Sequence, residues 1–102
     1  MGTNKRYADA IDKRSELRQL ERAMSQERPF TLTQYELELD DYPVTTTRKP
    51  VAVRVWVRYP AVVSKIDARA IAWTARAVKV EWDTPTGQVH TAWVWASAVD
   101  RR

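Results

Sequence analysis

The second half of the chain alternates between apolar and polar residues at every second position, a pattern typical of β-strands with one buried face. Between residues 51 and 59 the odd-numbered positions hold valines and a final tyrosine, while the even-numbered ones include Arg54, Trp56 and Arg58. Pro60 comes next, and proline is excluded from the interior of a central strand. We therefore predict a first strand over residues 51–59.

Four further strands are predicted after this one. They cover residues 68–74, 77–83 and 88–95, and a short piece at Val99 that follows a 3₁₀ turn over residues 96–98. Trp82 shares a strand face with Val80, and Trp93 and Trp95 share one with Val89, so we assign both faces to the core. Five short strands with short connections fit a small closed β-barrel, because closure removes exposed strand edges.

Residues 1–28 predict a charged helix, which Pro29 ends. Ala10, Leu17 and Met24 lie seven residues apart with Leu20 between them, so the apolar stripe of this helix is narrow. The stripe fits a helix that packs on its own domain. The alternative is a short coiled-coil segment that pairs with a partner or with a second copy in a homodimer.

Residues 29–50 predict an acidic extended segment followed by a loop over residues 45–50. Tyr35, Leu37 and Leu39 alternate with acidic residues, which favours a strand or extended conformation. The alternative is a short helix, because Thr33 followed by Glu36 has the spacing of a capping box. Together with residues 51–102, which we expect to hold the barrel, these segments form one structural domain.

The order of elements from Val78 to Val99 is strand, tight turn, strand, 3₁₀ turn and final strand. In this respect residues 51–102 resemble the small β-barrels of the SH3-like, Tudor and KOW types. The resemblance implies an α+β, mainly β fold in which an N-terminal helix precedes a five-stranded SH3-like β-barrel. The acidic cluster and the groove tyrosines of true SH3 domains are not evident, so proline-peptide binding is not implied. The composition resembles small uncharacterised proteins of actinobacteria and their phages.

The charge of the chain is modestly basic and unevenly distributed. The formal net charge is +4, with +2 on residues 1–28, −4 on residues 29–47 and +6 on residues 48–102. A basic barrel favours an acidic partner such as nucleic acid, although a charge of this size also serves solubility. The chain has no cysteine, no apolar leader and no apolar run long enough to span a membrane. We therefore expect a cytoplasmic protein without disulfides.

The sequence offers little for catalysis, and we expect no enzyme activity, no cofactor and no bound metal. His90 is the only histidine, and it lies on the strand face opposite Trp93. A single histidine without a placed carboxylate or nucleophile is usually a packing or surface residue. Glu36, Glu38 and Asp40 alternate and would suit a weak site for a hard cation, but such a run is more often a solvated strand face.

The candidate binding residues are aromatic and basic. If the valines of the first strand point inward, then Arg54, Trp56 and Arg58 point outward, and Arg69 and Lys79 extend this positive surface. An exposed Trp between two arginines suits stacking on a base or gripping a peptide. The alternative is that the N-terminal helix covers Trp56, which would make the stripe part of the core.

These observations predict a non-catalytic binding module. We expect a protein-interaction adaptor or inhibitor, of the kind that phages and mobile elements encode, that captures a protein partner through the helix or the aromatic face. The alternative is a small barrel associated with DNA or RNA, with Trp56 stacking on a base and the arginines contacting phosphates. Whether Trp56 is exposed decides if the first strand carries a binding face at all.

Overall fold

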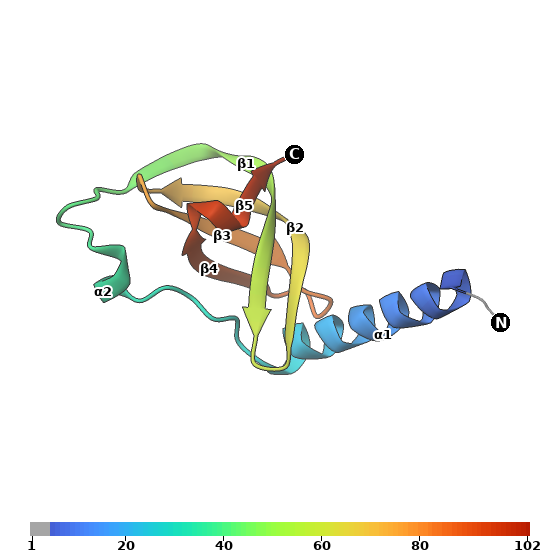
Figure 1. Ribbon diagram of the computed structural model, residues 1–102. Coiled ribbons are helices and arrows are strands. Elements are labelled where there is room, and N and C mark those ends of the chain that lie inside the picture. The colour runs from blue at the N-terminus through green and yellow to red at the C-terminus, as the bar shows by residue number, and fades with distance from the viewer. Residues whose placement is uncertain (1–4) are drawn as a thin grey trace.

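The structure is a computed structural model that describes the backbone of residues 5–102 and the side chains of residues 14–102. A long helix is followed by a linker with one short helix and then by five strands (Figure 1). The elements are α1 (Lys5–Gln26), α2 (Gln34–Leu37), β1 (Thr45–Tyr59), β2 (Val62–Trp73), β3 (Ala77–Asp83), β4 (Val89–Trp95), the 3₁₀ helix η1 (Ala96–Ala98) and β5 (Val99–Arg101). The fold is therefore α+β and mainly β, as the sequence predicted. Within the described residues no helix is both long and apolar enough to cross a membrane.

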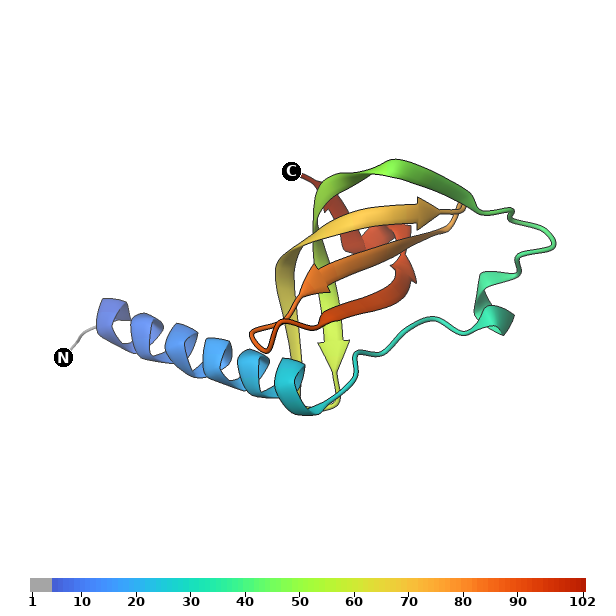
Figure 2. The ribbon, with the colours of Figure 1, turned by 180° about the vertical axis from the view of Figure 1, so that it is seen from behind.

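The five strands form one antiparallel sheet in the order β4-β3-β2-β1-β5. The sheet curls strongly, as Figures 1 and 2 show from opposite sides. Among the described strands β4 and β5 form the two edges and do not pair with each other. The prediction of a closed barrel was therefore wrong. The physical reason is the length of β5, whose three residues pair with β1 only from Val53 to Val55.

The inner face of the curled sheet holds the core. Val53, Val55, Val57 and Tyr59 of β1 are all at most 3% exposed, in the alternation that the sequence predicted. Several buried residues of β2 are alanines, and one of them, Ala68, lies opposite Val53. These small side chains leave room for large ones from β3, of which Trp82 is 2% exposed.

Helix α1 covers one end of this core with its last turns. Leu20, Ala23 and Met24 are buried and belong to the same apolar cluster as the β1 valines. The rest of the helix projects away from the sheet, and Leu17 is 55% exposed (Figures 1 and 2). Because Met24 is buried in its own domain, it is not free for pairing between helices. The side chain of Ala10, the first member of the predicted stripe, lies outside the described residues.

The segment around residues 33–41 contains the one-turn helix α2 and a turn where we favoured a strand. The capping box forms, because Thr33 Oγ1 accepts a hydrogen bond from the Glu36 backbone N–H and Glu36 Oε1 accepts one from the Thr33 N–H, both at 3.1 Å. Leu37, the last residue of α2, is 4% exposed, and Glu38 caps the helix with a φ of 49°. Local capping and one buried leucine therefore outweigh the alternation of apolar residues.

Two strand boundaries also differ from the prediction. The predicted loop over residues 45–50 belongs to β1, whose pairing with β2 is irregular between Thr46 and Val51. Strand β2 begins at Val62 rather than Ala68, so it pairs with β1 directly after the turn at residues 60–61. The sequence hid this hairpin because the turn contains proline and alanine instead of the glycine or asparagine that usually mark such turns.

Candidate binding groove

Trp56 lies on the outer face of β1 and is 51% exposed. Arg54 and Arg58, two residues away on either side, are exposed on the same face. The alternative in which the N-terminal helix covers Trp56 is therefore wrong, because Leu20 and Met24 of α1 belong to the core cluster on the inner side of the sheet. Exposing half of an indole to water is unfavourable, so this side chain is well placed for contact with a partner.

The gap between β1 and β4 is crossed by the linker that follows α1. The Phe30 N–H donates to the Arg58 carbonyl at 2.7 Å, and the Leu32 N–H donates to the Trp93 carbonyl at 2.9 Å. The Trp93 N–H in turn donates to Thr31 Oγ1 at 2.8 Å. Residues 30–32 thus connect β1 to β4 across the open side of the sheet through these three hydrogen bonds. A depression lies beside this stretch of the linker.

This depression, which we call the seam groove, has a volume of about 400 Å³. Trp56 and Arg58 line it from β1, and Trp93 and Trp95 line it from β4. Phe30 of the linker, Val63 of β2 and Glu36 of α2 are among its other lining residues. Phe30 is 58% and Trp95 is 36% exposed, so much of the aromatic lining faces solvent.

We predicted that Trp93 and Trp95 belong to the core, and this prediction was wrong. The inner face of β4 carries His90, Ala92 and Val94, of which Ala92 is 3% exposed. On this face Ala92 lies opposite Val80, and His90 lies opposite Trp82 with the ring centres 6.2 Å apart, so the space beside β3 is taken by side chains smaller than an indole. The face with the larger side chains therefore lies outside and contributes two tryptophans to the seam groove, which the sequence analysis missed.

Ion pairs engage much of the positive charge around Trp56. Arg54 Nε lies 3.4 Å from Asp67 Oδ1, and Lys65 Nζ lies 2.6 Å from Asp100 Oδ2. The hydrogen bond from Lys65, and then its charge, lower the pKa of Asp100 below its ordinary value. Lys65 Nζ also lies 6.0 Å from the centre of a Trp56 ring, at the outer limit of a cation–π contact. Arg58 forms no ion pair with any residue that the structure describes.

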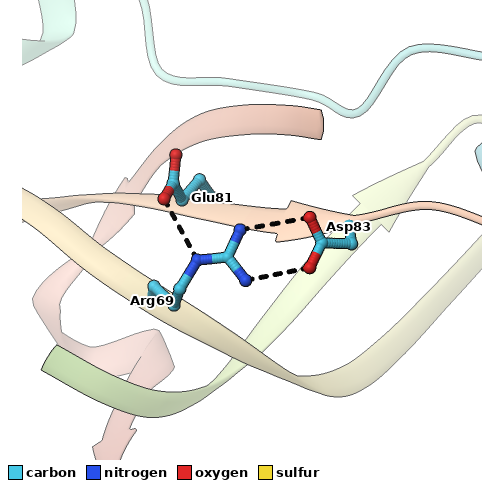
Figure 3. A network of polar contacts seen from close by, with 3 residues as sticks. All are labelled: Arg69, Glu81 and Asp83. Carbon is cyan, nitrogen blue, oxygen red and sulfur yellow. Dashed lines mark hydrogen bonds and ion pairs between the residues drawn. The ribbon is translucent and has the colours of Figure 1, made fainter. Parts of the chain in front are cut away.

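Arg69 is held by carboxylates and lies outside the seam groove (Figure 3). Its Nε donates to Glu81 Oε1 at 3.0 Å, and its two terminal nitrogens donate to Asp83 at 3.0 and 3.4 Å. The hydrogen bonds to Asp83 and then to Glu81 raise the pKa of Arg69. Lys79 is half-buried on β3 opposite Trp93. Of the five predicted binding residues, the structure therefore brings only Trp56 and Arg58 into the groove.

His90 points into the sheet and takes part in a packing network. The Tyr59 hydroxyl lies 2.7 Å from His90 Nδ1, and the Trp82 Nε1–H donates to the same hydroxyl at 3.1 Å. Burial, and then the nearby charge of Arg28, lower the pKa of His90, while burial raises the pKa of Tyr59. His90 therefore contacts both Tyr59 and Trp82 on the inner side of the sheet.

The acidic run of the linker does not share one face. Glu36 is engaged in the capping box, and Glu38 Oε2 accepts a hydrogen bond from Arg76 at 2.6 Å. Helix α2 breaks the alternation that would have aligned these side chains with Asp40. Within the described residues no group of three or more histidine, aspartate or glutamate side chains is placed to hold a metal ion.

Comparisons with protein-family models, with curated proteins and with solved structures find no match to this chain.

Proposed function

We propose that this protein is a non-catalytic binding module, an adaptor or inhibitor, that captures an apolar segment of one protein partner in the seam groove. The observation that carries the proposal is the gathering of four aromatic side chains around this groove, with Trp56 and Phe30 each more than half exposed. Tryptophan is among the residues that dominate the binding energy of protein interfaces, and exposed aromatic patches are rare on proteins without a partner.

The charge of the groove indicates what such a segment carries. Arg58 lines the groove without an ion pair from the described residues, and its planar guanidinium matches a carboxylate. Glu36, on another wall, already accepts hydrogen bonds from Thr33 through one of its carboxylate oxygens. We therefore expect the partner segment to combine bulky apolar side chains with one carboxylate that pairs with Arg58.

Association with nucleic acid is the second candidate function. An exposed Trp56 beside Arg58, which has no ion pair within the part of the chain that the structure describes, supports it, since stacking on a base and one phosphate contact need only these groups. The charges nearby favour the protein partner instead. Arg54 pairs with Asp67, and Arg69 pairs with Glu81 and Asp83. These arginines are therefore less available to bind phosphates, and the paired carboxylates repel the phosphate charges.

We further propose that the sheet is a variant of the SH3-like fold in which the barrel stays open. The order β4-β3-β2-β1-β5 and the 3₁₀ turn before β5 support this relation. In this variant the linker after α1, rather than a strand, spans the gap between β4 and β1, and the seam groove exists because of that gap.

The test is a selection from a library of peptides displayed on phage, carried out with the full chain. The selected peptides are titrated into isotopically nitrogen-labelled protein, and the indole N–H signals of its tryptophans are followed by NMR. We expect the signals of Trp56 and Trp95 to shift and that of Trp73, which does not line the groove, to stay unchanged. We also expect the selected peptides to contain an acidic residue.

The matched variants are Trp56→Ala and Val89→Ala. Val89 is an exposed apolar residue of β4 that does not line the groove. Trp56→Ala should weaken peptide binding at least about tenfold, and Val89→Ala should leave it unchanged. Peptides that bind Trp56→Ala as well as the native chain would contradict the proposal. Binding of short single-stranded DNA that weakens as salt rises and is lost in Trp56→Ala would favour the second candidate.

A further inference from the structure

A second depression lies on the inner side of the sheet, at the end away from the last turn of α1. It has a volume of about 250 Å³, and we call it the terminal recess. Val53 and Ala70, both at most 5% exposed, are its buried residues. Val51, Trp73, Val78 and Val99 are half-buried and form its walls. The recess is separate from the seam groove, because the two share no lining residue.

Two irregularities in strand pairing lie at this place. The register of β1 on β2 shifts between Thr46 and Val51, and the register of β2 on β3 shifts between Ala70 and Ala72. Such bulges bend a strand and redirect its side chains, and they are frequent next to binding sites. Here both shifts border the recess, and the small side chain of Ala70 leaves its interior unfilled.

One charged residue lines this apolar recess. Arg101 of β5 is exposed and forms no ion pair with the described residues, whereas its neighbour Arg102 lies 3.7 Å from Asp67. An apolar interior with a single guanidinium at the edge is complementary to a molecule that has an apolar body and one carboxylate. The same arrangement is unfavourable for an amine, because the two positive charges repel each other.

We infer that the terminal recess binds a small organic acid, with an aromatic ring or a short apolar chain against Trp73 and the valines and its carboxylate on Arg101. The size agrees with this class of ligand, since an apolar cavity of about 150 Å³ already takes up benzene. A recess of about 250 Å³ has room for a phenyl ring and a short chain that reaches Arg101. This inference does not depend on the function proposed for the seam groove.

The experiment uses three probes that share one skeleton and differ in charge: hydrocinnamate, phenylpropanol and phenylpropylamine. Each is titrated into the nitrogen-labelled full chain while the indole N–H signals of Trp73 and Trp56 are followed. We expect hydrocinnamate to shift the Trp73 signal in a saturable way and to leave Trp56 unchanged. The alcohol should bind about three- to fivefold more weakly than the acid, and the amine more weakly still.

The matched variants are Arg101→Gln and Arg102→Gln, which change two neighbouring exposed arginines. Arg101→Gln should reduce the affinity for hydrocinnamate to that for the alcohol, and Arg102→Gln should leave it unchanged. The inference is overturned if the Trp73 signal does not respond, if the amine binds as well as the acid, or if Arg101→Gln has no effect. A response confined to Trp56 would also overturn it, and would assign the acid to the seam groove.

Discussion

The Tyr59 hydroxyl and His90 Nδ1 lie 2.7 Å apart on the inner side of the sheet. Because the Trp82 Nε1–H donates to the same hydroxyl, the Tyr59 hydrogen is free to be donated to Nδ1. Nδ1 accepts this hydrogen only when it carries no proton of its own, so the network fits a neutral His90. The only histidine of the chain therefore couples its protonation to the packing of Trp82.

The first prediction is a loss of stability in mild acid. Folding lowers the pKa of His90, so the unfolded chain takes up its proton first as the pH falls. The stabilisation from neutral His90 is complete above the unfolded pKa of about 6.5 and is lost as the pH falls through the lower folded pKa. Urea unfolding at a series of pH values from about 8 to about 5 should show the free energy of unfolding decreasing.

The variant His90→Gln is the control for this pH dependence. Glutamine keeps an oxygen that accepts the Tyr59 hydrogen bond, but it does not titrate. Its unfolding free energy should be nearly constant over the same pH range. The pKa of Asp100 is lowered from an ordinary value near 3.8, so its contribution falls at more acidic pH and does not interfere. An equal pH dependence in His90→Gln and the native chain would refute this role for His90.

The second prediction concerns the Tyr59 hydroxyl itself. Tyr59→Phe leaves the Trp82 Nε1–H without an acceptor at a site where both rings are at most 2% exposed. We expect the free energy of unfolding to decrease by about 1–3 kcal/mol, the cost of an unsatisfied buried donor. Tyr35→Phe is the matched control, because Tyr35 is almost fully exposed and should change stability by less than about 0.5 kcal/mol. Equal effects of the two variants in urea unfolding would contradict the prediction.

The third prediction separates the two parts of α1. Met24→Ala removes a buried side chain of the core cluster and should lower the free energy of unfolding by about 2–5 kcal/mol. Leu17→Ala changes the exposed part of the helix and should cost less than about 0.5 kcal/mol. Thermal or urea unfolding measures both.

The buried and exposed parts of α1 should also respond differently to truncation. Removing residues 1–28 should unfold the domain, because it takes away Leu20, Ala23 and Met24 together, whereas removing residues 1–16 should not. Sedimentation of the native chain and of Leu17→Ala tests the predicted homodimer. If the helices pair, the native chain sediments as a dimer and the variant shifts towards monomer. A stable domain after removal of residues 1–28 would show that α1 is not part of the core.

The sequence predicted the strands whose alternation is strong. In β1 the four inward residues are valines and a tyrosine with polar residues between them, so the pattern indicated the buried face and put Trp56 on the other one. The sequence left open whether the N-terminal helix covers Trp56. In β4 both faces are largely apolar, and we chose the face with the larger residues. The choice failed because the face of β4 that packs beside Val80 and Trp82 of β3 carries Ala92 and His90. This is a property of packing between strands and is not visible in one strand alone.

The seam groove was predictable only in part. Trp56 and Arg58 follow from the alternation in β1, but the groove also needs Trp95 from β4 and Phe30 from the linker. These residues meet because the linker after α1 crosses the open side of the sheet through hydrogen bonds to Arg58 and Trp93. Such long-range contacts carry no local sequence signal. The capping box at Thr33 was the one local signal in the linker, and it identified α2 correctly as the alternative.

The last prediction concerns Arg76, which attaches the segment after α2 to the sheet. Its guanidinium carbon lies 4.9 Å from the centre of the Tyr42 ring and 5.2 Å from the centre of a Trp95 ring, and Nη1 donates to Glu38 Oε2 at 2.6 Å. Arg76→Ala removes two cation–π contacts and an exposed ion pair, which together contribute about 1–2 kcal/mol.

Local opening of this segment should then require less free energy than in the native chain. Amide hydrogen exchange of residues 34–42 should become about tenfold faster in Arg76→Ala, while exchange in β2 and β3 stays nearly unchanged. Arg48→Ala, which alters an exposed arginine of β1, is the control and should leave both regions as they are. Unchanged exchange in residues 34–42 would show that the buried Leu37 holds this segment without Arg76. Equally faster exchange throughout the sheet would show that Arg76 stabilises the whole domain.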